Sequence, residues 1–452
     1  MIAITENPTG QELKTILQRP SFDFSKIEKV VAPILDKVKR GGDKALRKLA
    51  LEYDQVELED LWVTEAEFAT ADEAVPSTLK EAIAIAYENV RKFHSAQQQS
   101  ILVMEVMPGV VCSRRSVPIR KVGLYVPGGS APLFSTVLML ATPAKIAGCQ
   151  EIIISSPTNR LGTINPVVLY TAKLVGVNRV LKLGGAQAIA AMAYGTETVP
   201  KVDKIFGPGN QYVTVAKQML AKQDVAIDMP AGPSEVMVIV DKHSDAGYAA
   251  SDLLAQAEHG PDSQVILIST SRSKAHEINE AIKLQIVKLP RRKIAEVALS
   301  QSSIIVVEDK KDALEIINEY GPEHLIISTS KAEKLAEKVI NAGSVFVGEY
   351  TPESAGDYAS GTNHTLPTNG WARSFSGVSL DSFVKNITYQ RITDEGLLLL
   401  GPTIELMAEA ELLDGHKNAV TIRLKKLRED GITGKSDKST PEGGDSILFS
   451  KG

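Results

Sequence analysis

The stretch Val122-Gly-Leu-Tyr-Val126, followed at once by Pro127-Gly-Gly129, shows the pattern that decides the fold of this chain. It is a short apolar run that ends in a turn and leads into a helical sequence. Eight further runs resemble it, and many are also followed by a Gly/Pro turn and a helix: 151–155, 180–183, 204–206, 236–240, 264–269, 303–307, 325–328 and 344–347. Alternation of this kind predicts an α/β fold with mostly parallel sheets. The runs are continuously apolar, as expected where helices cover both faces of a sheet.

Helical patterns flank this central region. Capping-box spacing at Ser25–Glu28 and at Thr64–Glu67 predicts two helix starts, and apolar residues at helical spacing predict the longer helices. In the N-terminal half we predict a short helix at Gln11–Leu17 within an arm (residues 1–20), helices that start at Ser25 and at Thr64, and a long helix at Ser77–Gln97. Near the C-terminus we predict one helix whose apolar stripe ends at Asp414-Gly415 and a second helix at Asn418–Leu427. After Gly361 the pattern is helical. Residues 429–452 are rich in Gly, Ser, Lys and Asp, which predicts a disordered tail.

The composition is that of an ordinary globular protein of 452 residues, long enough for roughly three domains. The 50 Lys plus Arg and 55 Asp plus Glu give a net charge of −5, so nucleic acid is not an expected partner. No apolar run approaches the ~20 residues that cross a bilayer, and the N-terminus lacks the basic region of a secretory signal. The two cysteines, Cys112 and Cys149, fit a reducing compartment. We therefore expect a cytoplasmic protein without a membrane segment.

Three glycine-rich turns resemble phosphate-binding motifs in part. Gly431–Ser436 resembles part of a phosphate-binding loop, but its glycine spacing is too short and no strand precedes it. Gly207–Tyr212 and Gly184–Gln187 each join a strand to a helix, where backbone N–H groups can approach a phosphate, although the dinucleotide fingerprint is incomplete. A tight turn with only a structural role explains both equally well. HExxH, CxxC and GxSxG motifs are absent from the sequence.

The seven histidines fall into two groups. Three of them lie among charged or small polar residues in surface-like segments and are expected to be ordinary exposed imidazoles: His94, His243 and His276. The other four lie in Gly/Pro-punctuated polar segments, where binding and catalytic residues concentrate: His259, His324, His364 and His416.

Two spacings have chemical meaning. Gln256 and His259 are three residues apart near a helix end, so both can face one ion, and Asp357 and His416 would complete a nitrogen and oxygen ligand set that zinc accepts. The alternative is a helix end with a solvated histidine. Glu323-His324 follows Gly321-Pro322 at a strand entrance and could supply two general bases. A salt-bridged Glu beside a hydrogen-bonded His is the alternative.

Six motifs, in order along the chain, resemble those of the histidinol dehydrogenase family: Val122–Thr136, Lys204–Asn210, Asp228–Glu235, Gln256–Asp262, Gly321–Leu325 and Gly356–His364. The resemblance runs from the N-terminal arm to about Arg428, and only the tail departs from it. It implies a zinc-dependent enzyme that oxidises L-histidinol through L-histidinaldehyde to L-histidine with two NAD, the last two steps of histidine biosynthesis.

The resemblance also assigns roles to residues. It implies that four residues hold zinc and also contact the substrate: Gln256, His259, Asp357 and His416. It implies that Glu323 and His324 are the catalytic bases, with His324 also contacting the substrate, and that Ser234, His364 and Glu411 complete the substrate site. The residues that it implies contact NAD are Tyr125, Gln187 and Asn210. Because an imidazole of ordinary pKa near ~6.5 exchanges protons near neutrality, His324 is expected to take the alcohol proton, and Glu323 is expected to activate water for the second step.

The family resemblance implies a domain plan and a partner. The plan has two incomplete Rossmann-like domains with mostly parallel sheets, a helical N-terminal arm and a C-terminal helical dimerisation unit. Its parts are 1–20 (arm), 21–117 with 234–360 (first α/β domain), 118–233 (NAD-binding domain), 361–428 (swapped helical unit) and 429–452 (tail). The family forms a domain-swapped homodimer, which would bring His416 and Glu411 into the partner's active site.

Two other classes of protein remain open from the sequence. A thiol-dependent aldehyde dehydrogenase without metal would use Cys112 or Cys149 as nucleophile, but both follow or precede apolar residues and are expected to be small buried side chains. A catalytically silent NAD- or metal-binding protein is the other alternative, and the presence of Glu323, His324 and Asp357 speaks against it.

Overall fold

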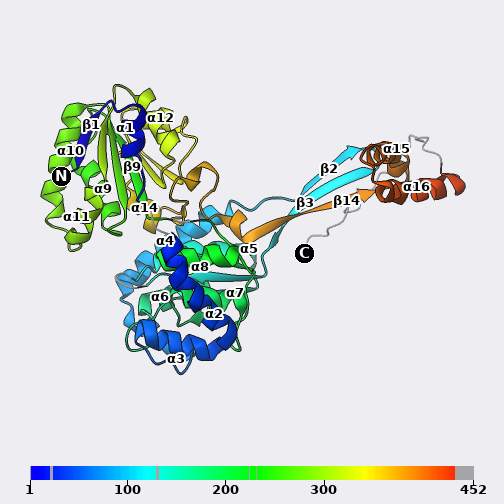
Figure 1. Ribbon diagram of the computed structural model, residues 1–452, viewed down its shortest axis with the longest axis horizontal. Coiled ribbons are helices and arrows are strands. Elements are labelled where there is room, and N and C mark those ends of the chain that lie inside the picture. Colours follow the sequence, from blue (N-terminus) through cyan, green and yellow to red (C-terminus); the bar gives the residue numbers. More distant parts are fainter. Residues whose placement is uncertain (1, 21–23, 129–131, 223, 231, 433–452) are drawn as a thin grey trace. The chain divides into compact units, whose positions relative to one another are not determined.

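Three β-sheets organise the part of the chain that the computed structural model describes, residues 2–20, 24–128, 132–222, 224–230 and 232–432 (Figure 1). The chain divides into two units. The first comprises Met1–Gln98 and Pro118–Lys385, and the second comprises Gln99–Val117 and Asn386–Gly452. The first unit holds two parallel sheets, each covered by helices on both faces, as the apolar runs predict. No described helix is long and apolar enough to span a membrane.

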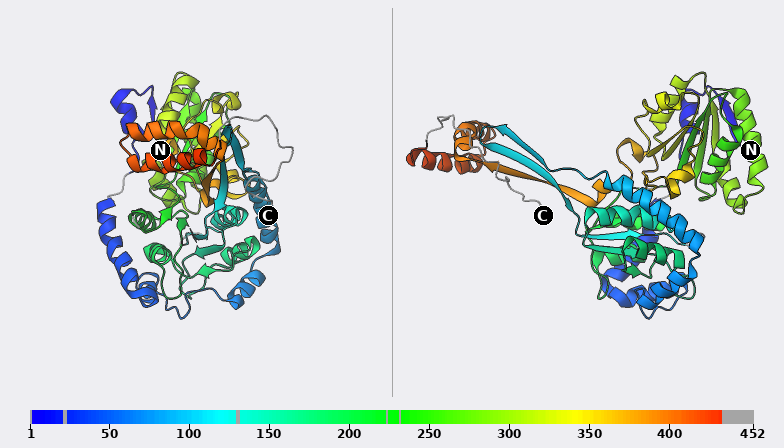
Figure 2. Two further views of the ribbon diagram at one scale, coloured as in Figure 1. Left: turned by 90° about the vertical axis from the view of Figure 1, so that its right-hand side faces the viewer. Right: turned by 180° about the vertical axis from the view of Figure 1, so that it is seen from behind.

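The six-stranded sheet of the first unit has the order β1-β11-β10-β9-β12-β13, with parallel pairing throughout. Figure 2 shows helices on both sides of this sheet. Its strands are β1 (Ala3–Glu6), β9 (Glu235–Val240), β10 (Gln264–Ser269), β11 (Ser303–Val306), β12 (His324–Ser328) and β13 (Ser344–Val347). One face packs on α9 (Ala246–Ala257), α10 (Arg272–Ile286) and α11 (Arg292–Ser300), and the other on α1 (Gly10–Ile16), α12 (Lys310–Tyr320) and α13 (Ala332–Ala336). The short helix α14 (Glu353–Tyr358) follows β13. Edge strand β1 was not predicted from the arm.

The five-stranded sheet has the order β6-β5-β4-β7-β8 and is also parallel. Its strands are β4 (Lys121–Tyr125), β5 (Glu151–Ser155), β6 (Val180–Leu181), β7 (Lys204–Phe206) and β8 (Ala226–Ile227). Its own helices are α5 (Ser135–Ala147), α6 (Pro166–Val175), α7 (Gly185–Tyr194) and α8 (Gln211–Ala221). All nine predicted apolar runs are therefore strands, within one or two residues at their ends.

The N-terminal helices cover this five-stranded sheet, which corrects the predicted grouping of 21–117 with 234–360. These helices are α2 (Phe24–Leu49), α3 (Glu65–Ala74) and α4 (Ser77–Ser95), with a π-helical turn at Ala50–Asp54 after α2. The apolar face of α2 packs with α7 and α8, and α3 and α4 pack with α5 and α6. An amphipathic pattern shows that one face is buried, but it does not specify which sheet covers that face.

The two predicted capping boxes have different outcomes. At Thr64 the box is present, because its hydroxyl accepts from Glu67 N–H at 3.2 Å and the Glu67 carboxylate accepts from Thr64 N–H at 2.8 Å. At Ser25 the predicted helix is present as α2, but Phe24 is already helical, so Ser25 does not take the N-cap position that a capping box requires. The predicted helix from Ser77 is confirmed as α4.

The second unit combines a three-stranded sheet with two helices that pack on each other. The sheet has the order β14-β3-β2, from β2 (Leu102–Met107), β3 (Val110–Pro118) and β14 (Val384–Ile392), and the helices are α15 (Asp394–Ala410) and α16 (Asp414–Glu429). The expectation of a purely helical region after Gly361 is thus wrong at β14, and two short 3-10 turns, Trp371–Arg373 and Leu380–Phe383, precede that strand. Residues 433–452, with most of the predicted tail, lie outside the described residues.

Candidate active site

Glu323 and His324 stand where the chain enters a central strand of the six-stranded sheet. Helix α12 ends at Tyr320 and is capped by Gly321, whose φ of +61° is left-handed backbone that glycine adopts without strain, and β12 begins at His324. Both side chains are buried, and His324 Nδ1 lies 3.6 Å from Glu323 Oε2. The two groups lie together because Glu323 precedes the regular strand, where successive side chains point to opposite faces.

Backbone groups of Glu235 on β9 hold both of these side chains. The Glu235 carbonyl oxygen lies 3.1 Å from His324 Nδ1, and the Glu235 N–H donates to Glu323 Oε2 at 2.9 Å. Nδ1 is therefore the ring nitrogen that bears the hydrogen. The other ring nitrogen, Nε2, has no hydrogen-bond partner among the described residues. His324 thus presents an acceptor nitrogen to the space in front of the strand.

The burial of this pair changes its titration. Burial lowers the pKa of His324 to about 3 and raises the pKa of Glu323 well above its usual range. The expected ordinary pKa of His324 is therefore wrong for the protein without ligands, because the ring is desolvated. It follows that the imidazole is neutral around neutral pH, with Nε2 unprotonated.

Gln256 and His259 lie at the C-terminal end of α9, three residues apart, as predicted. Gln256 is fully buried, yet neither its Oε1 nor its Nε2 has a hydrogen-bond partner in the described chain. Buried polar atoms are normally paired, so this amide is placed to bind a group that the described residues do not supply. His259, by contrast, is exposed.

A carboxylate that the sequence analysis missed joins this cluster. Glu353 and Asp357 lie one turn apart on α14, and the nearest ligand atoms of His259, Glu353 and Asp357 all lie within 4.8 Å of one another. Asp357 Oδ1 is also 3.8 Å from His324 Nε2. The signal for Glu353 was present in the sequence as an acid four residues before a predicted ligand, which puts both on one helix face.

The cluster is rich in acidic groups, which raise one another's pKa. Burial raises the pKa of Asp357 to about 6, and burial together with the neighbouring acids Asp357 and Glu323 raises the pKa of Glu353 well above its usual range. Neither carboxylate oxygen of Glu353 has a hydrogen-bond partner among the described residues. A cation placed here would relieve this cost, and the donor set of imidazole, carboxylate and amide oxygen suits zinc.

Two further predicted substrate contacts lie in the same unit. His364 Nδ1 is 3.0 Å from the backbone oxygen of Asp357, its Nε2 is 3.4 Å from Thr136 Oγ1, and burial lowers the pKa of His364 to about 4. Ser234 lines a cavity of about 540 Å³ together with His259 and Asn210. Of the cluster described above, His259 is the residue that lines this cavity.

The three predicted NAD-contacting residues line one cavity of about 490 Å³: Tyr125, Gln187 and Asn210. Asn210 also lines the substrate-side cavity, so the two hollows share a wall. The turn before it needs glycine, because Gly207 has a φ of +119° and a Cβ there would lie 2.1 Å from the Tyr125 carbonyl oxygen. The Asn210 amide oxygen caps α8 by accepting from two N–H groups, which leaves its NH2 group for a ligand.

The remaining predicted residues, Glu411 and His416, belong to the second unit. Both are exposed, Glu411 at the end of α15 and His416 in the first turn of α16. They come from a different unit than the cluster around His324. Their assignment to an active site stays a prediction.

The histidines and cysteines that were predicted to have no chemical role differ in burial, and His94 departs most from its prediction. It is fully buried, its Nδ1 lies 2.8 Å from the Val90 carbonyl oxygen, and burial lowers its pKa, so the expected exposed imidazole is wrong. His243 and His276 are exposed as expected. Cys149 is buried and its thiol pKa is raised to about 12 by burial, while Cys112 is half-buried rather than buried.

Fold and site together define an α/β enzyme in which buried acid–base groups adjoin a cluster of nitrogen and oxygen donors. Comparison with known proteins identifies the family. The family model described as histidinol dehydrogenase matches residues 17–424. The histidinol dehydrogenase of Bacteroides thetaiotaomicron is 53% identical over 428 residues (95% of this chain, 100% of the relative), and that of Escherichia coli K12 is 50% identical over 424 residues (93% and 97%).

A solved structure agrees with this match. The crystal structure of histidinol dehydrogenase from Elizabethkingia anophelis superposes with a TM-score of 0.93 at 48% identity, covering 94% of this chain and 99% of that one. The chain belongs to the histidinol dehydrogenase family and is an oxidoreductase.

Proposed function

We propose that this protein oxidises L-histidinol through L-histidinaldehyde to L-histidine, consuming two NAD+ and one water, in the last two steps of histidine biosynthesis. Family membership supports the reaction. The observation that carries the proposal is the cluster in which Glu323 and His324 meet Asp357, Glu353 and His259. The buried amide of Gln256, which has no hydrogen-bond partner among the described residues, lies on the helix that leads to His259. Buried, partnerless donors of this kind are groups prepared for a cation and for proton transfer.

In this proposal Gln256, His259 and Asp357 hold a zinc ion, with the fourth ligand from the partner subunit's His416. The bound zinc would supply a fixed point that orients the amine and imidazole nitrogens of the substrate, and it has no redox chemistry of its own. Glu353 faces the same space with an unpaired carboxyl group, which suits a positively charged substrate amine.

The protein's own residues would move the protons. In the first oxidation the substrate alcohol loses a hydride and a proton, and the neutral His324 can accept that proton at Nε2 while its Nδ1–H stays bound to the Glu235 carbonyl oxygen. The aldehyde then adds water before a second hydride leaves. Glu323, 3.6 Å from the same ring, can take a proton from that water. NAD+ bound against Tyr125, Gln187 and Asn210 would accept the hydride in each step.

We further propose a domain-swapped homodimer in the cytoplasm. The second unit exposes many apolar side chains for a part of this size, among them Met104 (57% exposed), Leu406 (69%) and Leu412 (87%). Surfaces of this kind mark protein–protein contacts, and a second copy would cover them while delivering Glu411 and His416 to its partner. Two free cysteines fit a reducing compartment.

One assay tests the proposed function. Purified protein is given L-histidinol and NAD+, NADH is followed by absorbance, and the measurement is repeated after chelation and after zinc is added back. We expect two NADH per histidinol, loss of activity on chelation and recovery with zinc. Activity that survives complete removal of metal would contradict the zinc assignment, and absence of NADH formation in the zinc-loaded protein would contradict the reaction. An active metal-free enzyme that a Cys149→Ser substitution silences would favour the thiol mechanism instead.

A further inference from the structure

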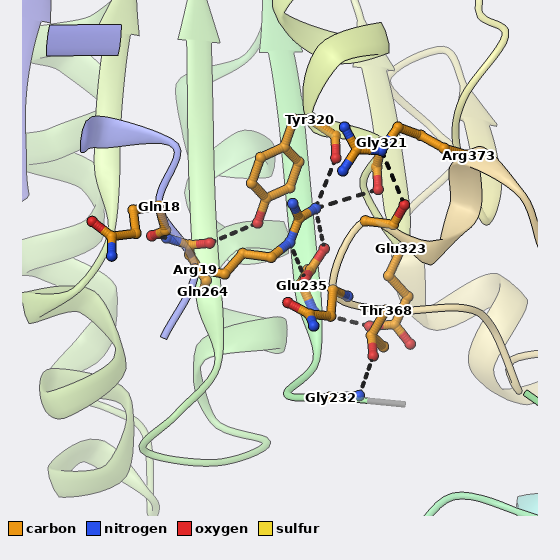
Figure 3. A network of polar contacts seen from close by, with 12 residues as sticks. Gln18, Arg19, Gly232, Glu235, Gln264, Tyr320, Gly321, Glu323, Thr368 and Arg373 are labelled. Carbon is orange, nitrogen blue, oxygen red and sulfur yellow. Dashed lines mark hydrogen bonds and ion pairs between the residues drawn. The ribbon is translucent and has the colours of Figure 1, made fainter. Parts of the chain in front are cut away.

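An arginine from the N-terminal arm reaches into the sheet behind the proposed bases. Arg19 Nε lies 2.6 Å and its Nη2 3.0 Å from the two carboxylate oxygens of Glu235, a two-point ion pair (Figure 3). The Glu235 side chain is only 2% exposed and that of Arg19 15%. The Glu235 carboxylate also accepts from the Asn369 N–H at 2.7 Å. The pair is therefore a built, largely buried feature and not a surface salt bridge.

Glu235 is the residue whose backbone holds both proposed bases. Its N–H donates to Glu323 and its carbonyl oxygen contacts His324 Nδ1. Because the side chain of Glu235 is fixed by Arg19, the position of these two backbone groups depends on the same guanidinium. The strand register supports this link, since Val236 pairs directly with His324.

Arg19 also holds the chain that leads into Glu323. Its Nη2 donates to the carbonyl oxygen of Tyr320 at 2.9 Å and contacts that of Gly321 at 3.4 Å, and its guanidinium lies 3.7 Å from the centre of the Tyr320 ring. These are the last residue of α12 and the glycine after it. The Arg19 side chain thus contacts both Glu235, whose backbone holds the proposed bases, and the turn that leads into Glu323 (Figure 3).

We propose that Arg19 is a positioning residue for the dehydrogenase reaction, which fixes Glu323 and His324 through Glu235 and the Tyr320–Gly321 turn without contacting substrate. The inference rests on the proposed function, because it takes Glu323 and His324 to be the bases. A group held in a productive geometry loses about 100-fold in rate for a displacement near 1 Å, so a brace of this kind affects turnover more than binding.

The test compares Arg19→Met, Arg19→Lys, the double variant Arg19→Met/Glu235→Gln and the control Arg272→Met. Arg272 pairs with Glu6 of the same arm at 2.8 Å, but that pair is exposed and lies away from the bases in the sequence and the sheet. For each variant, kcat and KM are measured with histidinol and with supplied histidinaldehyde, together with bound zinc per chain and melting temperature.

We expect Arg19→Met to lower kcat about 10- to 100-fold in both half-reactions, with KM and zinc content near the wild-type values. Arg19→Lys keeps the positive charge but not the planar guanidinium with its two parallel N–H donors, so its kcat should lie between those of the wild type and Arg19→Met. The double variant removes the unpaired buried carboxylate and should regain melting temperature without regaining kcat, since the bonds to the turn are still missing. Arg272→Met should match the wild type.

Two results would overturn the inference. One is wild-type kcat in folded Arg19→Met. The other is a kcat that returns in full along with the melting temperature in the double variant, because that is the behaviour of a merely structural ion pair. Glu323→Gln and His324→Ala are measured in parallel. If these two keep wild-type rates, the proposed base roles fail and the inference fails with them; if they are impaired while Arg19→Met is not, the inference alone fails.

Discussion

Replacing Gln256 by methionine should raise the free energy of unfolding of the metal-free protein and reduce the stabilisation that added zinc provides. The amide of Gln256 is fully buried with no partner for either polar atom in the described chain. Methionine has a similar length and volume and lacks the polar atoms, so it can fill the same space with little strain. The substitution therefore removes a desolvation cost when metal is absent and a ligand when metal is present.

The expected size follows from the number of orphaned atoms. A buried polar group without a partner costs about 1–3 kcal/mol, so Gln256→Met should raise the free energy of unfolding of the metal-free protein by about 1–2 kcal/mol after some loss of packing. One kcal/mol corresponds to about 2–4 °C in melting temperature for a cooperative unit of 150–250 residues. An increase of roughly 2–8 °C is expected.

The measurement is thermal unfolding in chelator and in excess zinc. Gln264→Met is the matched control, because Gln264 is also buried but its NH2 donates to the Gln18 carbonyl oxygen at 3.0 Å and its oxygen accepts from the Tyr320 hydroxyl at 2.6 Å. That control should melt lower than the wild type in chelator. If Gln256→Met also melts lower in chelator, the amide is satisfied by something other than a metal. If zinc raises its melting temperature as much as in the wild type, Gln256 is not a ligand.

Four further outcomes are expected. Glu323→Gln should slow conversion of supplied aldehyde far more than the first oxidation, and equal losses in the two half-reactions would contradict the split of roles. His416→Ala and His324→Ala should each be inactive, but co-refolded heterodimers of the two should recover part of the activity; verified heterodimers without activity would refute a shared site. Cys149→Ser should keep both half-reactions, since burial raises the thiol pKa to about 12 and keeps the nucleophilic thiolate scarce; loss of the aldehyde step alone would revive a thiol mechanism. Burial lowers the pKa of His94 in the folded protein, so the unfolded chain binds a proton at a higher pH than the folded one. The free energy of unfolding should therefore fall as pH drops below ~6.5, with a slope of up to ~1.4 kcal/mol per pH unit from this residue. His94→Gln should flatten that slope in denaturant titrations at neutral and mildly acidic pH.

The strands of the two parallel sheets could be predicted because burial on both faces leaves continuous apolar runs. The antiparallel sheet of the second unit could not, since its strands mix polar and exposed apolar residues. Met104 on β2 is 57% exposed in one chain, and β14 has no buried residue, with the adjacent Lys385 and Asn386 both exposed. Without a covered face there is no periodic signal to recognise.

The candidate site was predictable where its residues lie close in sequence. Gln256 and His259 share a helix end and Glu323-His324 are adjacent, so local spacing found them. Glu353 was missed although it lies one turn from Asp357, because a single acid in a helix is usually a solvated surface group. The convergence of α9, β12 and α14 depends on sheet order, which sequence spacing does not contain.

The pairing of β1 with β11 also constrains how the chain is made. Ala3 pairs with Ser303, so β1 is synthesised about 300 residues before the strand that it pairs with. At roughly 5–20 residues per second this delay is on the order of 15–60 s, during which an apolar edge segment has no partner. The five-stranded sheet, complete by β8, can form during that interval. We therefore expect the arm to dock only after β11 has been made, and a bulky fusion at the N-terminus to slow maturation more than one at the C-terminus.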